Sequence, residues 1–379
     1  MSRSLALSAV LLLASSCGPG EAPPQAPVPR KMLPSEEPSK QESFLLKAPA
    51  QDGPIRRGPY VQAVGTTTAT ICFELWQDAE GTVECDGKKR SSVPGTRHEI
   101  ALTGLRPYTR YDYTVQPGEV KASFRTSPEG GDELSFLAWG DCRTYYERLA
   151  RMASLAAKDL ADFSVHTGDL VDEGTVPEDW DRFFEAAAPL LRTGALWPSM
   201  GNHEYDAKLY YELFILPDPE RYYTFVAGPA QFYILDADWT GRRDPKQAAW
   251  FESELQKSRS RFKFVVLHQP VLSCPCDDYS PATSMYRIFG GLIERYRVTA
   301  VFQGHNHNYQ RAERNGVLYI TTGGAGAPLY SIGDLGKETK FAKVVNHYCR
   351  VRLSGRRMTL EAVDLNGAVF DRDERTLPP

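Results

Sequence analysis

The chain has 379 residues, of which 42% are hydrophobic and 24% are charged, with a formal net charge of −4. This length suggests two or three folded units with a globular composition. The slightly acidic balance argues against a protein that binds nucleic acid as a partner, because such proteins carry basic patches. It does not exclude a small phosphate ester as substrate, since metal ions can supply the positive charge.

The N-terminus has the features of a targeting segment. Arg3 is followed by an apolar run over residues 5–14 and then by Cys17. A basic residue, a short apolar core and small residues are typical of a secretory signal, and the run is too short to span a bilayer. The segment also resembles the lipobox of bacterial lipoproteins, which implies a lipid on Cys17; ordinary signal-peptide cleavage is the alternative. We expect residues 1–17 to direct export and the mature chain to be a membrane-anchored lipoprotein, periplasmic or at the cell surface.

Two segments of different character follow the signal. Residues 18–52 are rich in Pro, Ala, Glu and Gln, a composition that buries too little apolar surface to fold, so we expect a disordered tether. Over residues 53–130, short alternating segments are punctuated by Gly and Pro, which predicts a small all-β sandwich. Residues 102–113 resemble the corner region of fibronectin type III domains, and residues 123–126 resemble their last strand.

Strands and helices alternate over residues 131–372, which predicts a layered α/β domain. The expected strands are 134–139, 162–167, 196–200, 231–235, 262–267, 298–302 and 317–322. The expected helices are 145–160, 177–191, 246–258 and 284–297. The last stretch, 348–372, is expected to form antiparallel strands with turns at Ser354-Gly355 and Asn366-Gly367.

Chemically active side chains follow five of these strands at their carboxyl ends, where sites form in open α/β sheets. They are Asp141, Asp169, the pair Asn202-His203, His268, and the pair His305 and His307. Each motif alone is weak, because Gly-Asp is usually a turn and a single His is usually structural. Four of the seven histidines nevertheless fall in this set, so the set as a whole predicts a metal site. Imidazole nitrogens with carboxylate and amide oxygens suit Zn, Mn or Fe better than Ca.

In order and layout these motifs resemble those of the calcineurin-like metallophosphoesterases, and the preceding sandwich makes the purple acid phosphatase branch the most similar. The resemblance implies a four-layer α/β/β/α sandwich with two divalent or mixed-valence metal ions. It implies that Asp169 bridges both ions. It also implies that the first site is completed by Asp141 and His307, and the second by Asn202, His268 and His305. His203 would point at the leaving group, as a general acid rather than a ligand or a loop support, with Glu204 or another group orienting its ring.

Two positions depart from the family pattern. Arg143 stands where many members have a metal-binding His, so the first site is one protein ligand short. Asp172 stands where the purple enzymes have the Tyr that binds ferric iron. Two roles are open for Arg143: a bidentate contact with the substrate phosphate, or a surface salt bridge.

Six cysteines besides Cys17 would meet an oxidising compartment after export. Cys72 could pair with Cys85, and Cys142 could pair with Cys274 or Cys276. Free thiols are the alternative at these last three positions.

The function expected from these features is an extracytoplasmic hydrolase of phosphate mono- or diesters, with its specificity set by loops 205–230 and 273–284. A nucleotide or pyrophosphate hydrolase on the same scaffold is the second interpretation. The third is a cell-surface binding lipoprotein with a decayed site. The expected partners are a small phosphate ester and, through the lipid anchor, the membrane.

Overall fold

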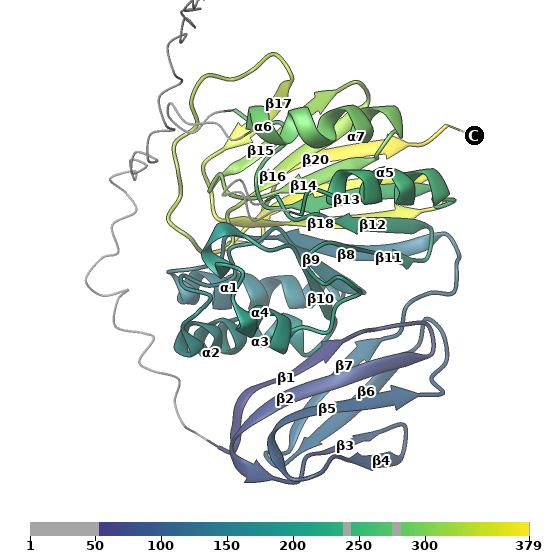
Figure 1. The fold of residues 1–379 in the computed structure, drawn as a ribbon, viewed down its shortest axis with the longest axis vertical. Helices are drawn as coiled ribbons and strands as arrows, with labels where there is room; N and C mark the ends of the chain where they lie inside the picture. The colour runs from purple at the N-terminus through teal and green to yellow at the C-terminus, as the bar shows by residue number, and fades with distance from the viewer. Residues whose placement is uncertain (1–52, 238–243, 275–281, 379) are drawn as a thin grey trace, which may run out of the picture.

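The computed structural model describes residues 53–237, 244–274 and 282–378 (Figure 1). The predicted signal segment with Cys17 and the predicted tether lie outside these residues, as does Cys276. Within the described ranges, no helix combines the length and apolar character that crossing a membrane requires.

The first unit is all-β, as predicted. Two antiparallel sheets face each other across a core that includes Val61, Phe73 and Phe124. The first sheet has the order β1 (Ile55–Gln62), β2 (Thr68–Ala79), β5 (Gly95–Thr103). The second has the order β4 (Lys88–Ser91), β3 (Thr82–Cys85), β6 (Arg110–Gln116), β7 (Val120–Arg125). The hydroxyl of Tyr111 accepts the backbone N–H of Arg106 at 2.7 Å, a contact of the tyrosine-corner type seen in such sandwiches.

The second unit is built on two mixed sheets, which confirms the α/β class. One has the order β10 (Ala195–Pro198), β9 (Phe163–His166), β8 (Glu133–Trp139), β18 (His347–Ser354), β19 (Arg357–Asp364), β20 (Val369–Thr376). The other has the order β11 (Tyr223–Ala227), β12 (Ala230–Ile234), β13 (Phe262–Leu267), β14 (Ala300–Gln303), β16 (Val317–Thr322), β15 (Tyr309–Arg314), β17 (Thr339–Lys343). In the first sheet β8, β9 and β10 are parallel, and in the second β12, β13, β14 and β16 are parallel.

The two sheets pack face to face, with helices on their outer faces. Phe136 of β8 lies edge-on to Phe232, Phe264 and Phe302 of the other sheet, with ring centroids 5.0, 5.1 and 5.7 Å away. The helices beside the first sheet are α1 (Tyr146–Ala156), α2 (Pro177–Ala186), α3 (Ala188–Leu191) and α4 (Lys208–Leu213). Those on the second are α5 (Gln247–Lys257), α6 (Ala282–Met285) and α7 (Gly291–Arg295). Figure 1 shows these two helical groups on opposite sides of the paired sheets, which is the four-layer arrangement that the family resemblance implies.

Some expected elements differ in detail. The expected helix over 284–297 is interrupted between α6 and α7 by a π-helical turn, Tyr286–Gly290. Three strands, β11, β15 and β17, were not expected. β15 alternates charged with buried residues, and β17 carries two lysines and has no buried position, so both lack the apolar run that marks a buried strand.

The sandwich packs against α2, α3 and α4 of the second unit. Arg57 of β1 is buried and pairs with Asp181 of α2 at 2.5 Å and with Glu74 of β2 at 2.7 Å. Tyr60 donates its hydroxyl hydrogen to the carbonyl of Leu213 at 3.0 Å. These contacts hold the sandwich against the helices that flank the first sheet.

The proposed disulfides are wrong for the described cysteines, which are free and buried. Cys72 belongs to the larger core, which extends into the second unit, whereas Cys85 belongs to the core of the sandwich. The sulfur of Cys142 lies 3.4 Å from His166 Nε2, and that of Cys274 lies 3.0 Å from the hydroxyl of Thr339. The cysteines that were expected to pair therefore lie in different surroundings.

Candidate active site

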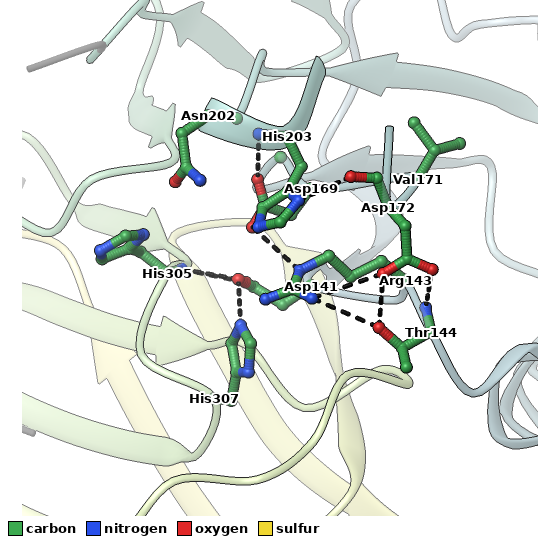
Figure 2. A network of polar contacts seen from close by, with 12 residues as sticks. Asp141, Arg143, Thr144, Asp169, Val171, Asp172, Asn202, His203, His305 and His307 are labelled. Atoms are coloured by element: carbon green, nitrogen blue, oxygen red, sulfur yellow. Dashed lines mark hydrogen bonds and ion pairs between the residues drawn. The ribbon is translucent and has the colours of Figure 1, made fainter. Parts of the chain in front are cut away.

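The candidate residues lie where the carboxyl ends of parallel strands from the two sheets meet. Asp141 follows β8, Asp169 follows β9 and Asn202 follows β10 in one sheet. His268 follows β13, and both His305 and His307 follow β14, in the other. Figure 2 shows Asp141 and Asp169 side by side, with Asn202, His305 and His307 around them and Arg143 reaching toward Asp169.

Small residues make this close approach possible. Gly168 has φ +88°, and a Cβ there would lie 2.8 Å from His268 Nδ1. A Cβ at Gly201 would lie 2.2 Å from the Asp169 carboxylate. Asp141, Asp169 and His305 themselves adopt left-handed φ of 53°, 57° and 67°. Residues with side chains occupy this region at a cost, and such strain is concentrated at functional sites.

One half of the site is a dense cluster of ligand atoms around His268. Its Nε2 lies 3.3 Å from Asp169 Oδ1, 3.1 Å from Asn202 Oδ1 and 3.2 Å from His305 Nδ1. The Nδ1–H of His268 donates to the carbonyl of Thr167 at 2.8 Å, so in the neutral ring Nε2 carries a lone pair. Lone pairs of nitrogen and oxygen thus face one another, an arrangement that a cation stabilises. The residues fit the second metal site that the family resemblance implies.

The other half of the site is sparser. His307 Nε2 lies 3.2 Å from Asp141 Oδ1, and its Nδ1–H donates to the carbonyl of Pro328 at 2.6 Å. The ring of Tyr330 stacks on His307 with centroids 3.9 Å apart. Burial raises the pKa of Asp141 to about 7, because removing a carboxylate from water disfavours its charge. A bound cation would offset this cost. Asp141 and His307 therefore fit an ion, with fewer side-chain ligands than the cluster around His268 offers.

Asp169 lies between the two halves. Burial favours its protonated form, but the neighbouring His268, His203 and Arg143 favour the carboxylate and hold its pKa below the ordinary value. Ligand atoms of Asp141, Asp169 and His268 all lie within 4.8 Å of one another. This central position suits the bridging role that the resemblance implies.

Arg143 lies against the carboxylate of Asp169. Its Nε is 3.5 Å from Asp169 Oδ2, and its Nη1 is 3.4 Å from Asp172 Oδ1. Asp172 in turn accepts the backbone N–H of Thr144 at 2.9 Å, so it fixes the turn that carries Arg143. The guanidinium therefore forms ion pairs, at the edge of the metal-ligand cluster and largely shielded from solvent.

His203 faces Asp169 from the solvent side. Its backbone N–H donates to Asp169 Oδ1 at 3.1 Å, and its Nδ1–H donates to the carbonyl of Asp172 at 2.7 Å. The second ring nitrogen, Nε2, lies 4.0 Å from Asp169 Oδ2. Asp172 therefore fixes the ring and leaves Nε2 directed at the site. The pattern of strand ends gave no indication of this contact, which uses a backbone carbonyl.

Of the two alternatives for the group that orients His203, the structure favours the second: the ring is held by the carbonyl of Asp172, and Glu204 binds elsewhere. Its buried carboxylate accepts backbone N–H groups of Gly201 at 2.5 Å, Asp169 at 3.0 Å and Leu170 at 2.8 Å. It therefore ties together the loops after β9 and β10. Adjacency in sequence suggested Glu204, but the side chains of consecutive residues in this turn point in different directions.

Tyr330 and Gln269 also lie at the site and were not foreseen. Gln269 Nε2 lies 3.4 Å from Asn202 Oδ1 and 3.3 Å from His305 Nδ1. Gln269 directly follows His268, so a polar residue beside the expected ligand was an available signal. Tyr330 lies in a Gly-rich loop, and the sequence carries no pattern that points to it.

Residues 134–309 match the family model described as "Calcineurin-like phosphoesterase". This range contains every proposed metal ligand. The chain contains a calcineurin-like metallophosphoesterase domain. Its curated relatives include purple acid phosphatase 21 of Arabidopsis thaliana, 25% identical over 258 residues, with 61% of this chain and 59% of the relative covered. Purple acid phosphatase 23 of the same plant is 26% identical over 287 residues, with 61% and 63% covered. The chain thus spans about three fifths of the length of these relatives.

Solved structures show the same fold. The purple acid phosphatase PPD1 of yellow lupin (Lupinus luteus) superimposes with a TM-score of 0.73 at 17% identity, covering 86% of this chain and 74% of the lupin chain. A structure titled "Structure of PhoD" gives a TM-score of 0.66 at 12% identity, covering 85% of this chain and 89% of that one. The lupin match extends over most of the chain, in agreement with the predicted architecture.

Proposed function

We propose that this protein is an exported, membrane-anchored phosphoesterase that hydrolyses phosphate mono- or diesters with two metal ions. The observation that carries the proposal is the convergence of His268 Nε2 with the donor atoms of Asp169, Asn202 and His305, at 3.1–3.3 Å. Four ligand atoms with lone pairs at such short distances repel one another, and a bound cation would relieve this repulsion. The calcineurin-like phosphoesterase domain supports phosphate esters as the substrate class.

The two halves of the site would hold the two ions. Asp169, Asn202, His268 and His305 would hold one, and Asp141, Asp169 and His307 the other. The donor set suits divalent or mixed-valence Zn, Mn or Fe. When bound, such ions polarise the phosphoryl group and lower the pKa of a bound water.

Arg143 and His203 would act on the substrate directly. The guanidinium of Arg143 can bind phosphate oxygens, and its place beside Asp169 puts it next to the ligand cluster. His203 would donate a proton from Nε2 to the departing oxygen. Its Nδ1–H bond to the carbonyl of Asp172 fixes the ring for that transfer.

The test is metal analysis of the purified protein together with turnover of p-nitrophenyl phosphate and bis(p-nitrophenyl) phosphate. Bound metal with turnover of either ester supports the enzyme, and the ratio of the two rates separates monoesterase from diesterase. Protein that binds no metal and hydrolyses neither ester would support the alternative, a surface-binding lipoprotein with a decayed site.

Export and anchoring rest on the N-terminal sequence alone. Cys17→Ser in the full-length chain is expected to move the protein from the membrane fraction to the soluble fraction. Cys349→Ser, which removes a buried cysteine of β18, is the matched control and should stay with the membranes. Unchanged membrane association of Cys17→Ser would contradict the lipid anchor.

A further inference from the structure

An exposed aromatic side chain lies beside the proposed proton donor. Tyr205 is 43% exposed, although most large apolar side chains of the described residues are buried. Its ring centroid lies 6.2 Å from that of His203, with the planes at 65°. Asp169, His203 and Tyr205 are successively more exposed. Tyr205 is therefore a more solvent-exposed neighbour of His203, at the outer side of the candidate site.

The backbone at Tyr205 is strained. Tyr205 and Asp206 are consecutive residues with left-handed φ of 54° and 56°. A bulky aromatic residue rarely occupies this region, and such conformations persist where the surroundings fix them.

A polar network fixes this bend. Asp206 accepts the hydroxyl of Tyr211 at 2.6 Å and Nη1 of Arg221 at 3.0 Å. Arg221 also pairs through Nε with the buried carboxylate of Asp236 at 2.5 Å. Asp236 follows β12, which lies next to β13 and therefore next to His268 in the same sheet. The bend is thus tied to the frame that carries the metal ligands, and the Tyr205 ring is held in place beside His203.

We propose that Tyr205 is a specificity-determining residue that stacks against a planar aromatic leaving group, such as the base of a nucleoside phosphate. This inference rests on the proposed phosphoesterase function and adds a substrate class to it. An aromatic face at the solvent side of the site gains energy by stacking with another planar ring. It gains little from a short alkyl leaving group.

The test compares kcat/KM for adenosine 5′-monophosphate and glycerol 3-phosphate. Both release a primary alkoxide, so their need for protonation is matched and the planar base is the main difference. Wild-type protein is expected to prefer the adenosine ester. Tyr205→Asn keeps a residue that tolerates left-handed φ, and should lower kcat/KM for that ester about 10-fold, the scale of one base–aromatic stack. Its effect on glycerol 3-phosphate should be small, and Tyr205→Phe should retain the preference.

Tyr108→Asn is the matched control. Tyr108 is 41% exposed and has a left-handed φ of 46°, but it lies in the N-terminal sandwich. It should leave both substrates unaffected. An equal loss for both substrates in Tyr205→Asn, or no loss for either, would overturn the stacking role. Absence of turnover with any ester in wild-type protein would instead overturn the phosphoesterase function itself, and this inference with it.

Discussion

The two halves of the candidate metal centre differ in how much they need a cation. Around His268 Nε2, three further ligand atoms converge at 3.1–3.3 Å, from Asp169, Asn202 and His305. Around Asp141, the backbone N–H of His305 donates to the carboxylate at 3.0 Å, and His307 Nε2 is 3.2 Å away. Arg143 adds a positive charge beside the shared Asp169. A bound ion is therefore stabilised more in the dense half around His268 than in the sparse half around Asp141, and we expect one tight and one weak site.

The largest effect is expected from His268→Ala. Removing a ligand from the dense half should release the tight ion and remove measurable turnover, since the ion supplies most of the charge stabilisation. Metal content after dialysis and turnover of p-nitrophenyl phosphate check this. His307→Ala is the matched variant of the sparse half, and it should retain the tight ion and lose only the weak one. A titration of wild-type protein that finds two equally tight sites would contradict the comparison.

His203→Ala should affect chemistry without affecting either ion. Positioned proton transfer contributes about 10²–10⁴-fold, so kcat for an alkyl phosphate should fall by that factor while both metals stay bound. The loss should shrink for p-nitrophenyl phosphate, because nitrophenolate leaves without much protonation. Stopped assays of both substrates with the same protein sample check the difference.

Two other outcomes would assign His203 a different role. Release of a metal ion from His203→Ala would make the residue a ligand. An equal loss with good and poor leaving groups would make it a support for its loop. His166→Gln serves as a control for a buried histidine near the same strands, because His166 contacts Cys142 and the N–H of Gly168 and should not change the dependence on the leaving group.

Arg143→His should make the two halves more alike. The change replaces the guanidinium beside Asp169 with an imidazole. This restores the family pattern, in which the half of the site around Asp141 has one more protein ligand. The affinity for the weak ion should rise by about 10–100-fold, the range by which changes around a metal site typically alter metal affinity. Calorimetric titration with Zn²⁺ or Mn²⁺ checks it. Arg143→Ala is the control, and it should raise KM for the phosphate ester without supplying a ligand.

The main strands and the placement of the candidate ligands at strand ends could be predicted because both follow from short-range patterns, whereas the four-layer arrangement was implied by the family resemblance. Runs such as Phe262–Leu267 are fully apolar at all but one position, so their strand character does not depend on distant partners. Asp141 follows a parallel strand of one sheet and His268 a parallel strand of the other, and the carboxyl ends of these strands meet at the site. This is why residues 127 positions apart, by their numbers, could be predicted as neighbours.

Contacts made by loops could not be predicted in the same way. Glu204 binds the backbone after β9, and Asp172 binds the ring of His203 through a carbonyl. Neither contact leaves a signal in residue spacing, because backbone groups are present at every position. His98 of the sandwich is likewise buried against Phe73 and hydrogen-bonded to Ser92 at 2.6 Å. The burial of a polar residue inside a strand can be recognised only when its hydrogen-bond partner is known.

The smallest expected effect concerns the support beneath the sparse half. His347 is buried, its backbone N–H donates to the carbonyl of Gly324, and the neighbouring Gly323 packs against Asp141. Burial lowers the pKa of His347 from 6.5 to about 4. The unfolded chain therefore takes up this proton near pH 6.5 and the folded protein only near pH 4. The contribution of neutral His347 to the free energy of unfolding is fully present above pH 6.5 and is lost as the pH falls from 6.5 to 4.

The loss attributable to His347 should be on the order of 1–3 kcal/mol between pH 6.5 and 4. His347→Gln cannot take up the proton and should show a shallower fall in the free energy of unfolding over that range. Urea unfolding in the presence of a chelator measures the difference, because metal release then adds nothing to the slope. Burial also lowers the pKa of His166, to about 3, so part of the pH dependence should persist in the variant. If the free energy of unfolding falls equally with pH in wild type and His347→Gln, this histidine titrates alike in the folded and unfolded protein. Its protonation would then not destabilise the sparse half of the site.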